Sequence, residues 1–217
     1  MRFLGNKYRI LALLAAAAAA GHAELRVSVY ATAGGIHRYL STPEGRGRAE
    51  AALKRLSVSR IFLEGRRGDE YVPPDKLREV RDFFTARGFA VAGGIATVPG
   101  KTFGVRQNGG LGWLNWQNQK TQADIARFFT ENAALFDELI VDDFYCTADT
   151  SPESETARGG RGWGEYRRDL LAGLIEPMIR RPAAAANPRV RLTIKYPQWY
   201  DRFHLFEIGR ASCRERV

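Results

Sequence analysis

Apolar runs alternate with amphipathic segments along most of the chain. Five short runs rich in β-branched and aromatic residues predict strands at residues 25–31, 60–63, 89–98, 138–145 and 190–196. Between them, apolar residues recur at helical spacing and predict helices at residues 48–56, 73–88, 121–135 and 163–180. Because each predicted helix connects two predicted strands, the pattern indicates a parallel sheet with crossover helices.

Residues at the helix ends support these assignments. Prolines 73 and 74 open the second helix, and Gly88 ends it. Thr121 and Asp124 resemble a capping box and predict the start of the third helix, while Pro177 predicts a kink in the fourth. The positions expected to face inward are Ala52, Leu53 and Leu56, then Leu77, Val80 and Phe84, then Ile125, Phe128, Phe129 and Leu135, and finally Leu170, Leu171, Leu174, Ile175 and Met178.

The spacing of these elements favours a barrel over an open sheet. Each strand–helix unit spans roughly 41 residues, so eight units would form a barrel somewhat longer than the typical length of about 250 residues. A doubly wound open sheet, the main alternative, usually has a glycine-rich phosphate turn after an early strand, and residues 31–37 lack that spacing. We therefore expect an α/β fold, an incomplete (β/α)8 TIM barrel with about five of its eight strands present. The unpaired strand edges of such a fragment would promote aggregation.

The two ends of the chain are expected to lie outside this domain. Residues 1–23 resemble a secretory signal peptide, with basic residues first, an apolar stretch at residues 10–20 and small residues before the cleavage site. That stretch is too short to span a bilayer, which takes about 20 residues. Residues 207–217 resemble a translated sequencing adapter and are expected to be a non-native tail. Residues 24–206 would then be the N-terminal part of a barrel domain in a periplasmic or extracellular protein, with no membrane attachment after signal cleavage.

The net charge depends largely on these ends. The whole chain has 33 Lys and Arg residues against 24 Asp and Glu residues, a formal charge of +9, which falls to +4 for residues 24–207. The remaining surplus lies in short pairs such as Arg66 and Arg67, which we interpret as solvated helix faces. No basic stripe is interleaved with aromatic residues, so nucleic-acid binding is not expected. Nor do we expect a cofactor or a metal.

Cys146 is predicted to be a buried free thiol or to have lost its disulfide partner with the missing part of the domain.

Charged residues follow the predicted strands at the ends where barrel enzymes hold their functional groups. Asp142 and Asp143 come directly after the apolar residues 139–141. Since a buried carboxylate is costly unless it is paired, two of them at this point indicate a catalytic role. Alternation along the next strand turns Thr193 and Lys195 to the barrel interior, so Lys195 is expected to approach the Asp pair. The alternative is a purely structural ion pair.

Aromatic and amide side chains surround this pair in the predicted loops. Flat rings beside Asn, Gln and Asp suit sugars, which present apolar C–H faces and a rim of hydroxyl groups. The alternative is that the rings pack a minor core beneath the long loops. The expected substrate-binding residues are Tyr30, Glu64, Trp113, Trp116, Tyr145, Lys195, Tyr196, Trp199 and Tyr200.

Two motifs resemble segments of a known family. Residues 136–145, FDELIVDDFY, resemble the fourth-strand segment of bacterial glycoside-hydrolase-like barrels, in which Asp-Asp-aromatic-aromatic follows an apolar strand. Residues 194–200, IKYPQWY, resemble the next strand end of a secreted, poorly characterised group with the same architecture. The resemblance implies hydrolysis of glycosidic bonds in an extracellular or periplasmic polysaccharide. It also implies that Asp142 and Asp143 act as acid/base, nucleophile or sugar-binding carboxylates.

Glycoside hydrolysis requires two carboxyl groups, about 5 Å apart for retention and roughly 6.5–9.5 Å apart for inversion. Adjacent residues of a strand point to opposite faces, so Asp142 and Asp143 are not expected to form that pair alone. Glu64 is the candidate partner within this chain, and the other possibility is a carboxylate on the missing strands, which would leave the fragment inactive. The alternative function is a non-catalytic glycan-binding barrel, in which the aromatic residues bind and the carboxylates hydrogen-bond the sugar.

Overall fold

The computed structural model describes residues 26–109, 112–142, 145–195 and 209–210 of the chain. Its main sheet contains all five predicted strands, which are parallel and lie in the order β1 (Val27–Ala31), β2 (Val58–Arg67), β4 (Ala90–Ala96), β5 (Glu138–Asp142) and β7 (Arg191–Ile194). A short strand, β3 (Glu70–Tyr71), pairs antiparallel with β2. The predicted parallel α/β sheet is confirmed. Within the described residues it is not closed, because β1 and β7 form its two edges.

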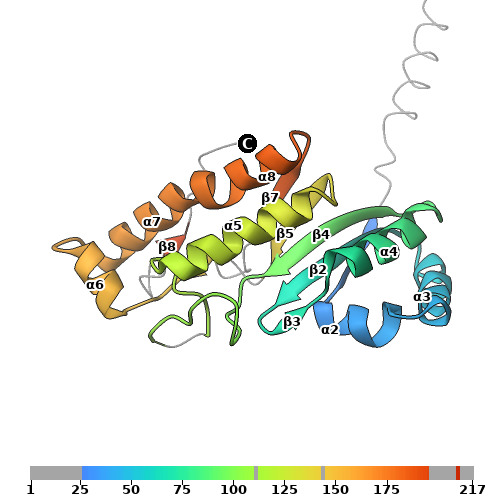
Figure 1. The fold of residues 1–217 in the computed structure, drawn as a ribbon, viewed down its shortest axis with the longest axis horizontal. Coiled ribbons are helices and arrows are strands. Elements are labelled where there is room, and N and C mark those ends of the chain that lie inside the picture. Colours follow the sequence, from blue (N-terminus) through green and yellow to red (C-terminus); the bar gives the residue numbers. More distant parts are fainter. Residues whose placement is uncertain (1–25, 110–111, 143–144, 196–208, 211–217) are drawn as a thin grey trace, which may run out of the picture.

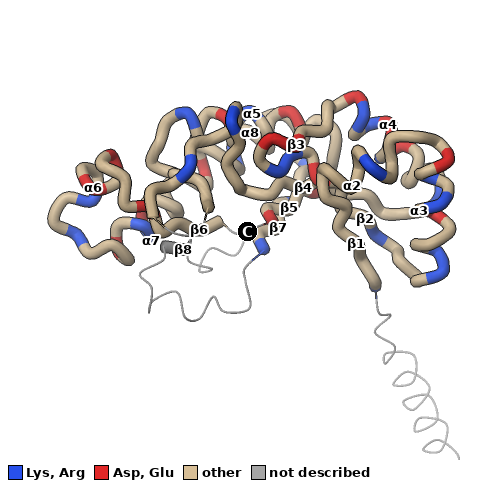
Figure 2. The backbone as a smooth tube through the Cα atoms, turned by 90° about the horizontal axis from the view of Figure 1, so that it is seen from below, with Lys and Arg blue, Asp and Glu red and all other residues tan. Residues whose placement is uncertain are grey.

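Helices follow the strands in sequence and cover one face of the sheet (Figure 1). Seen from below, α5 and α8 lie above β5 and β7, and α4 lies above β2 (Figure 2). No helix in the described part of the chain has the length and apolarity needed to span a bilayer. The helical segments are α2 (Ala33–Gly35), the π-helical η1 (Ile36–Leu40), α3 (Pro43–Arg55), α4 (Pro74–Thr85), α5 (Gln119–Ala133), α6 (Pro152–Arg158), α7 (Trp163–Leu174), the π-helical η2 (Ile175–Arg180) and α8 (Arg181–Ala186).

The hydrophobic core lies between the sheet and this layer of helices. Alternation along the strands turns Ile61, Leu63, Ile95, Leu139 and Val141 toward the helices, and all five are buried. The apolar positions predicted for the second and third helical segments are buried against them, as expected from their spacing: Leu77, Val80, Phe84, Ile125, Phe128, Phe129 and Leu135. The first predicted helix differs at one position, since Leu56 caps the C-terminus of α3 and is 67% exposed.

Strand β4 has small residues on the face that points away from the helices. Ala92, Gly94 and Ala96 alternate on that face, and Ala96 is in register with Arg67 of β2 on one side and with Asp142 of β5 on the other. Because none of the three small residues has a side chain larger than a methyl group, longer side chains from β2 and β5 can meet across β4.

Helix α5 does not begin where the capping-box pattern predicts. Its N-cap is Asn118, and the prediction that Thr121 starts the helix is wrong. Thr121 Oγ1 accepts a hydrogen bond from the backbone N–H of Val105, and the Asp124 carboxylate accepts one from the N–H of Gly104. The two side chains therefore hold the preceding loop against the helix instead of capping it.

Other local differences have identifiable causes. Helix α3 begins at Pro43, earlier than predicted, because the Thr42 hydroxyl accepts the N–H of Gly45 and proline is favoured in the first turn. The predicted kink at Pro177 is a π-helical segment, η2, between α7 and α8. A second sheet pairs β6 (Cys146–Thr147) with β8 (Gly209–Arg210), which falls in the predicted non-native tail. These two strands and α2, η1, β3, α6 and α8 were not predicted.

Cys146 lies in this second sheet with its side chain buried. Its Sγ is a free thiol, in line with the first of the two predicted alternatives. Burial raises the pKa of the Cys146 thiol, so the sulfur stays protonated at neutral pH.

Gly93 tests the packing between β4 and the helices. A Cβ atom at this position would lie 2.5 Å from Phe136 Cδ2 and 2.7 Å from Leu139 Cδ2. We expect Gly93→Ala to lower the free energy of unfolding by about 1–3 kcal/mol, because both neighbours are buried side chains of a packed core. Urea denaturation measures this change.

Gly47, inside α3, provides the matched control, since a Cβ there meets no atom within 4 Å. Gly47→Ala should raise the free energy of unfolding by roughly 0.5–1 kcal/mol, because alanine loses less conformational entropy in a helix. Equal effects of the two substitutions would contradict the packing described for β4.

Candidate functional site

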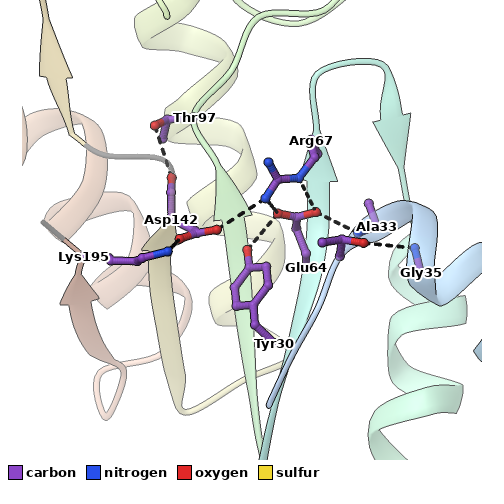
Figure 3. Close-up of polar contacts among 9 residues, drawn as sticks. Tyr30, Ala33, Gly35, Glu64, Arg67, Thr97, Asp142 and Lys195 are labelled. Carbon is purple, nitrogen blue, oxygen red and sulfur yellow. Dashed lines mark hydrogen bonds and ion pairs between the residues drawn. The ribbon is translucent and has the colours of Figure 1, made fainter. Parts of the chain in front are cut away.

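Five polar side chains form a continuous chain across the sheet near the carboxyl ends of its strands (Figure 3). Tyr30 comes from β1, Glu64 and Arg67 from β2, Asp142 from β5, and Lys195 follows β7. Each contacts the next by a hydrogen bond or an ion pair, in the order in which they are named. All five lie on the face that points away from the helices.

Glu64 is the most buried of these five side chains and has no exposed surface. Its Oε1 accepts hydrogen bonds from the Tyr30 hydroxyl at 2.8 Å and from Arg67 Nη2 at 2.9 Å. Its Oε2 accepts from the Ala33 backbone N–H at 2.7 Å and from Arg67 Nε at 3.1 Å. Four donors thus converge on the carboxylate, about the full number that two carboxylate oxygens accept.

Burial and hydrogen bonding act in opposite directions on the protonation of Glu64. Burial raises the pKa of the Glu64 carboxyl above its ordinary value, and the bonds from Ala33, Arg67 and Tyr30 partly offset that rise. Burial, followed by the negative charge of Glu64, also raises the pKa of the Tyr30 hydroxyl. Tyr30 therefore remains protonated and donates its hydrogen to Glu64.

Arg67 links the two carboxylates. The Nε and Nη2 atoms of its guanidinium form a fork that binds both oxygens of Glu64. Nη2 also lies 3.3 Å from Asp142 Oδ2. Since one nitrogen contacts both groups, Glu64 Oε1 and Asp142 Oδ2 can be no farther apart than those two contact distances together. A bidentate Arg–carboxylate pair is also geometrically specific, so Arg67 has a defined orientation toward Asp142.

Asp142 is held by groups from both neighbouring strands. Lys195 Nζ donates to Asp142 Oδ1 at 2.6 Å, which confirms the predicted approach of Lys195 to this aspartate. The backbone carbonyl of Asp142 accepts from the N–H and the hydroxyl of Thr97, the residue that follows β4. The Asp142 side chain retains 9% exposure, whereas that of Lys195 is 52% exposed, so the site is reached from the side of Lys195.

The interpretation of Arg66 and Arg67 as solvated helix residues is wrong, because both belong to β2. The register of β2 on β4 shifts between Glu64 and Arg66, so Gly65 forms a bulge. In a regular strand, residues three positions apart face opposite sides, but the extra residue of a bulge returns Arg67 to the face of Glu64. No feature of the sequence pattern other than Gly65 indicates this bulge.

Arg66 is turned to the helix side of the same strand. Its guanidinium carbon lies 4.4 Å from the ring centre of Tyr71 and 4.6 Å from that of Phe103. Burial lowers the pKa of Arg66 relative to its ordinary value. The two consecutive arginines therefore have different surroundings, one between aromatic rings and one between carboxylates.

Two of the predicted sugar-binding aromatics pack inside the protein. Trp116 is 1% exposed and donates its Nε1–H to the carbonyl of Cys146, while Tyr145 has no exposed surface and donates its hydroxyl to the carbonyl of Leu171. Their rings meet edge to face at 4.8 Å. For these two residues the structure matches the alternative of a minor core beneath the loops. Trp113 is half-buried.

Several predicted site residues lie outside the described part of the chain: Asp143, Tyr196, Trp199 and Tyr200. Within the described residues, no group of three or more His, Cys, Asp or Glu side chains is placed to hold a metal ion. In the described site, anionic and cationic side chains alternate. Asp142 is the carboxylate of this row that is partly exposed.

Three comparisons relate the chain to known proteins. Residues 14–209 match the family model described as a probable glycosyl hydrolase catalytic domain. The chain is 25% identical over 195 residues to the uncharacterized protein SSO3021 of Saccharolobus solfataricus, covering 76% of this chain. It spans 33% of the length of that relative.

Solved structures share the fold at low sequence identity. The glycoside hydrolase domain of PgaB (BpsB) from Bordetella bronchiseptica superposes with a TM-score of 0.61 at 15% identity, over 87% of this chain and 70% of that domain. A hypothetical protein from Ruminiclostridium thermocellum superposes with a TM-score of 0.51 at 15% identity, over 77% of this chain and 96% of the other. The fold prediction, an incomplete barrel of the TIM type, agrees with these neighbours. By its family match over residues 14–209, this chain belongs to the probable glycosyl hydrolase catalytic domains.

Proposed function

We propose that this chain hydrolyses glycosidic bonds of a polysaccharide and that Asp142 is one of the reacting carboxylates. The observation that carries this proposal is the position of Asp142 at the carboxyl end of a parallel sheet, bound by both Lys195 and Arg67. In (β/α)8 enzymes, this end of the sheet holds the active site. Membership of a glycosyl hydrolase catalytic-domain family supports the chemistry.

The surroundings of Asp142 suit a carboxylate that works as an anion. Charge-assisted hydrogen bonds from Lys195 and Arg67 stabilise its negative charge. Such a group acts as the nucleophile at the anomeric carbon or as the base that activates water, and not as the acid that protonates the departing oxygen. Over the whole reaction, one water molecule is consumed. Its hydroxyl group ends on the anomeric carbon, and its remaining proton ends on the oxygen of the leaving sugar.

The acid in this reaction must be a second carboxyl group. Glu64 is connected to Asp142 through Arg67, but it has no exposed surface and already accepts four hydrogen bonds, so we do not assign it this role. Asp143 remains a proposed catalytic or sugar-binding carboxylate. We assign the acid to a carboxyl group on a later strand of a longer chain. That carboxyl group would face Asp142 across the barrel.

Substrate contacts are proposed for Lys195 and for four aromatic residues. Lys195 is more than half exposed beside Asp142 and can donate to a sugar hydroxyl. The rings proposed to bind the apolar faces of sugars are Trp113, Tyr196, Trp199 and Tyr200. Trp116 and Tyr145 are buried and are assigned a packing role instead.

A longer, exported protein would complete this site. We propose that residues 1–23 direct export to a periplasmic or extracellular compartment, where a polysaccharide is the substrate, and that further strands pair with the two edges of the sheet. The fraction of the PgaB domain and of the Saccharolobus protein that this chain spans, 70% and 33%, supports such an extension.

Asp142→Asn tests the assignment of the reacting carboxylate. In the full-length protein, we expect kcat for polysaccharide hydrolysis to fall by roughly 10²–10⁴-fold, because an amide is neither a nucleophile nor a base at this position. Release of reducing sugar measures turnover, and isothermal titration with oligosaccharides should still detect binding.

Asp137→Asn is the control for this substitution. Asp137 precedes β5 at the opposite end of the strand, where its carboxylate contacts Asn187 and Arg189. Its replacement should leave kcat unchanged. Unchanged turnover in Asp142→Asn would refute the assignment, and sugar binding by a wild-type protein without hydrolysis would favour the glycan-binding alternative.

The open sheet leads to a prediction about chain length. The 217-residue chain, produced alone, should aggregate, because β1 and β7 each present an unpaired edge within the described sheet. The product of an extended gene should elute as a soluble species in size-exclusion chromatography and should hydrolyse the polysaccharide. A soluble, fully active 217-residue chain would contradict this expectation.

A further inference from the structure

We propose that Glu64 is a positioning residue, which fixes the guanidinium of Arg67 so that Arg67 holds Asp142 in its working orientation. This inference rests on the proposed function of Asp142 and deepens it. It assigns Glu64 no contact with the substrate, in contrast to the sequence-based expectation.

The first support is the saturation of Glu64. A carboxylate with no exposed surface is costly to bury and must be compensated by several partners. Here the partners come from three separate elements: the Tyr30 hydroxyl of β1, the Ala33 N–H at the start of α2, and both nitrogens of the Arg67 fork on β2. Glu64 is thus fixed from several directions, and its two oxygens define where the Arg67 fork must lie.

The second support is the asymmetry of Arg67. Among the contacts of the described residues, Nε and Nη2 bind Glu64, and Nη2 also reaches Asp142, at the longer distance of 3.3 Å. The Arg67 side chain is 33% exposed and has many rotamers, so the contact with Asp142 does not by itself fix it. The contact with Glu64 is bidentate and therefore geometrically specific, so it fixes the placement of Nη2 beside Asp142.

The third support is that β4 has only small side chains between Arg67 and Asp142. Ala96 is in register with both Arg67 and Asp142, and Gly94 is in register with Glu64. A Cβ atom on Gly94 would already lie 3.1 Å from the Tyr30 ring. Strand β4 therefore provides the space that allows an arginine of β2 to reach a carboxylate of β5.

The same sheet face provides an internal control. Glu138 of β5 binds Arg60 of β2 and Arg191 of β7, each at 3.0 Å, nearer the amino ends of the strands. It resembles Glu64 in being a carboxylate that joins strands, but neither of these ion pairs involves Arg67 or Asp142. A purely structural ion pair of this face is therefore available for comparison.

Glu64→Gln is the central variant, made in the full-length protein. An amide has only one acceptor oxygen, so its NH₂ group would oppose either Arg67 Nη2 or both Arg67 Nε and the Ala33 N–H, and each orientation removes one contact of the Arg67 guanidinium. We expect kcat for hydrolysis of the polysaccharide substrate to fall about 10- to 100-fold, with KM changed by less than about threefold, because only the orientation of a reacting group is lost. Glu64→Asp, which retains the charge but shortens the reach, should lower kcat less.

A second measurement does not depend on activity. The Arg67 Nε–H donates to Glu64, so in protein labelled with ¹⁵N-arginine its resonance should exchange slowly with water, and Arg67→Lys identifies the signal. In Glu64→Gln this resonance should be lost through rapid exchange. In Glu138→Gln it should persist, and kcat should stay at the wild-type value.

The outcomes separate the two proposals. Persistence of the protected Arg67 signal in Glu64→Gln would overturn the positioning role, as would an unchanged kcat in both Glu64 variants of an active enzyme. If the wild-type protein hydrolyses no polysaccharide, the proposed function fails, and the Arg67 signal alone decides whether Glu64 positions Arg67. If Glu64→Gln does not fold, as judged by circular dichroism, the same two measurements on Glu64→Asp decide the question.

Discussion

The candidate site depends on one contact across the sheet, between Arg67 of β2 and Asp142 of β5. These strands are not neighbours, because β4 lies between them. The contact at 3.3 Å exists because β4 presents only alanine and glycine on that face, at positions 90, 92, 94 and 96. A larger residue at Ala96 would separate the arginine from the aspartate. The glycines and alanines that weaken β4 as a strand are thus what lets charged groups of its two neighbours meet.

This contact organises the charges on either side of it. Along the sheet, a neutral donor, an anion, a cation, an anion and a second cation follow one another from Tyr30 to Lys195. Each charge contacts at least one group of opposite sign, which offsets the cost of removing it from water. The two carboxylates are the least exposed members of this row, with Glu64 inaccessible and the Asp142 side chain 9% exposed, whereas the side chain of Lys195 is 52% exposed. Glu64 is therefore enclosed by the protein, and Lys195 is open to solvent beside Asp142.

Much of the fold could be predicted from the periodicity of the sequence, and part of the site from its position at the strand ends. The five strands and the buried faces of α4 and α5 follow from regular alternation and helical spacing. The pairing of Lys195 with Asp142 follows from the same alternation in two adjacent strands. Regular patterns predict these features because regular hydrogen bonding produces them.

Features that depend on irregular backbone or on tertiary context could not be predicted. Alternation places Arg67 on the wrong face, and only the bulge at Gly65 corrects it. Thr121 has the sequence of a helix cap but bonds to a loop whose path the sequence does not reveal. Trp116 and Tyr145 suit a sugar by residue type, and their burial depends on how the loops fold over them. In each case, a residue's role was decided by a neighbour distant in the sequence.

A double-mutant cycle between Arg67 and Asp142 tests the central contact most directly. The free energy of unfolding of the full-length protein would be measured by urea denaturation for Arg67→Gln, Asp142→Asn and the double variant. If the side chains meet across β4, the two effects should be non-additive, with a coupling energy between about 0.5 and 3 kcal/mol. Effects that add to within about 0.3 kcal/mol would contradict the contact and the site built on it.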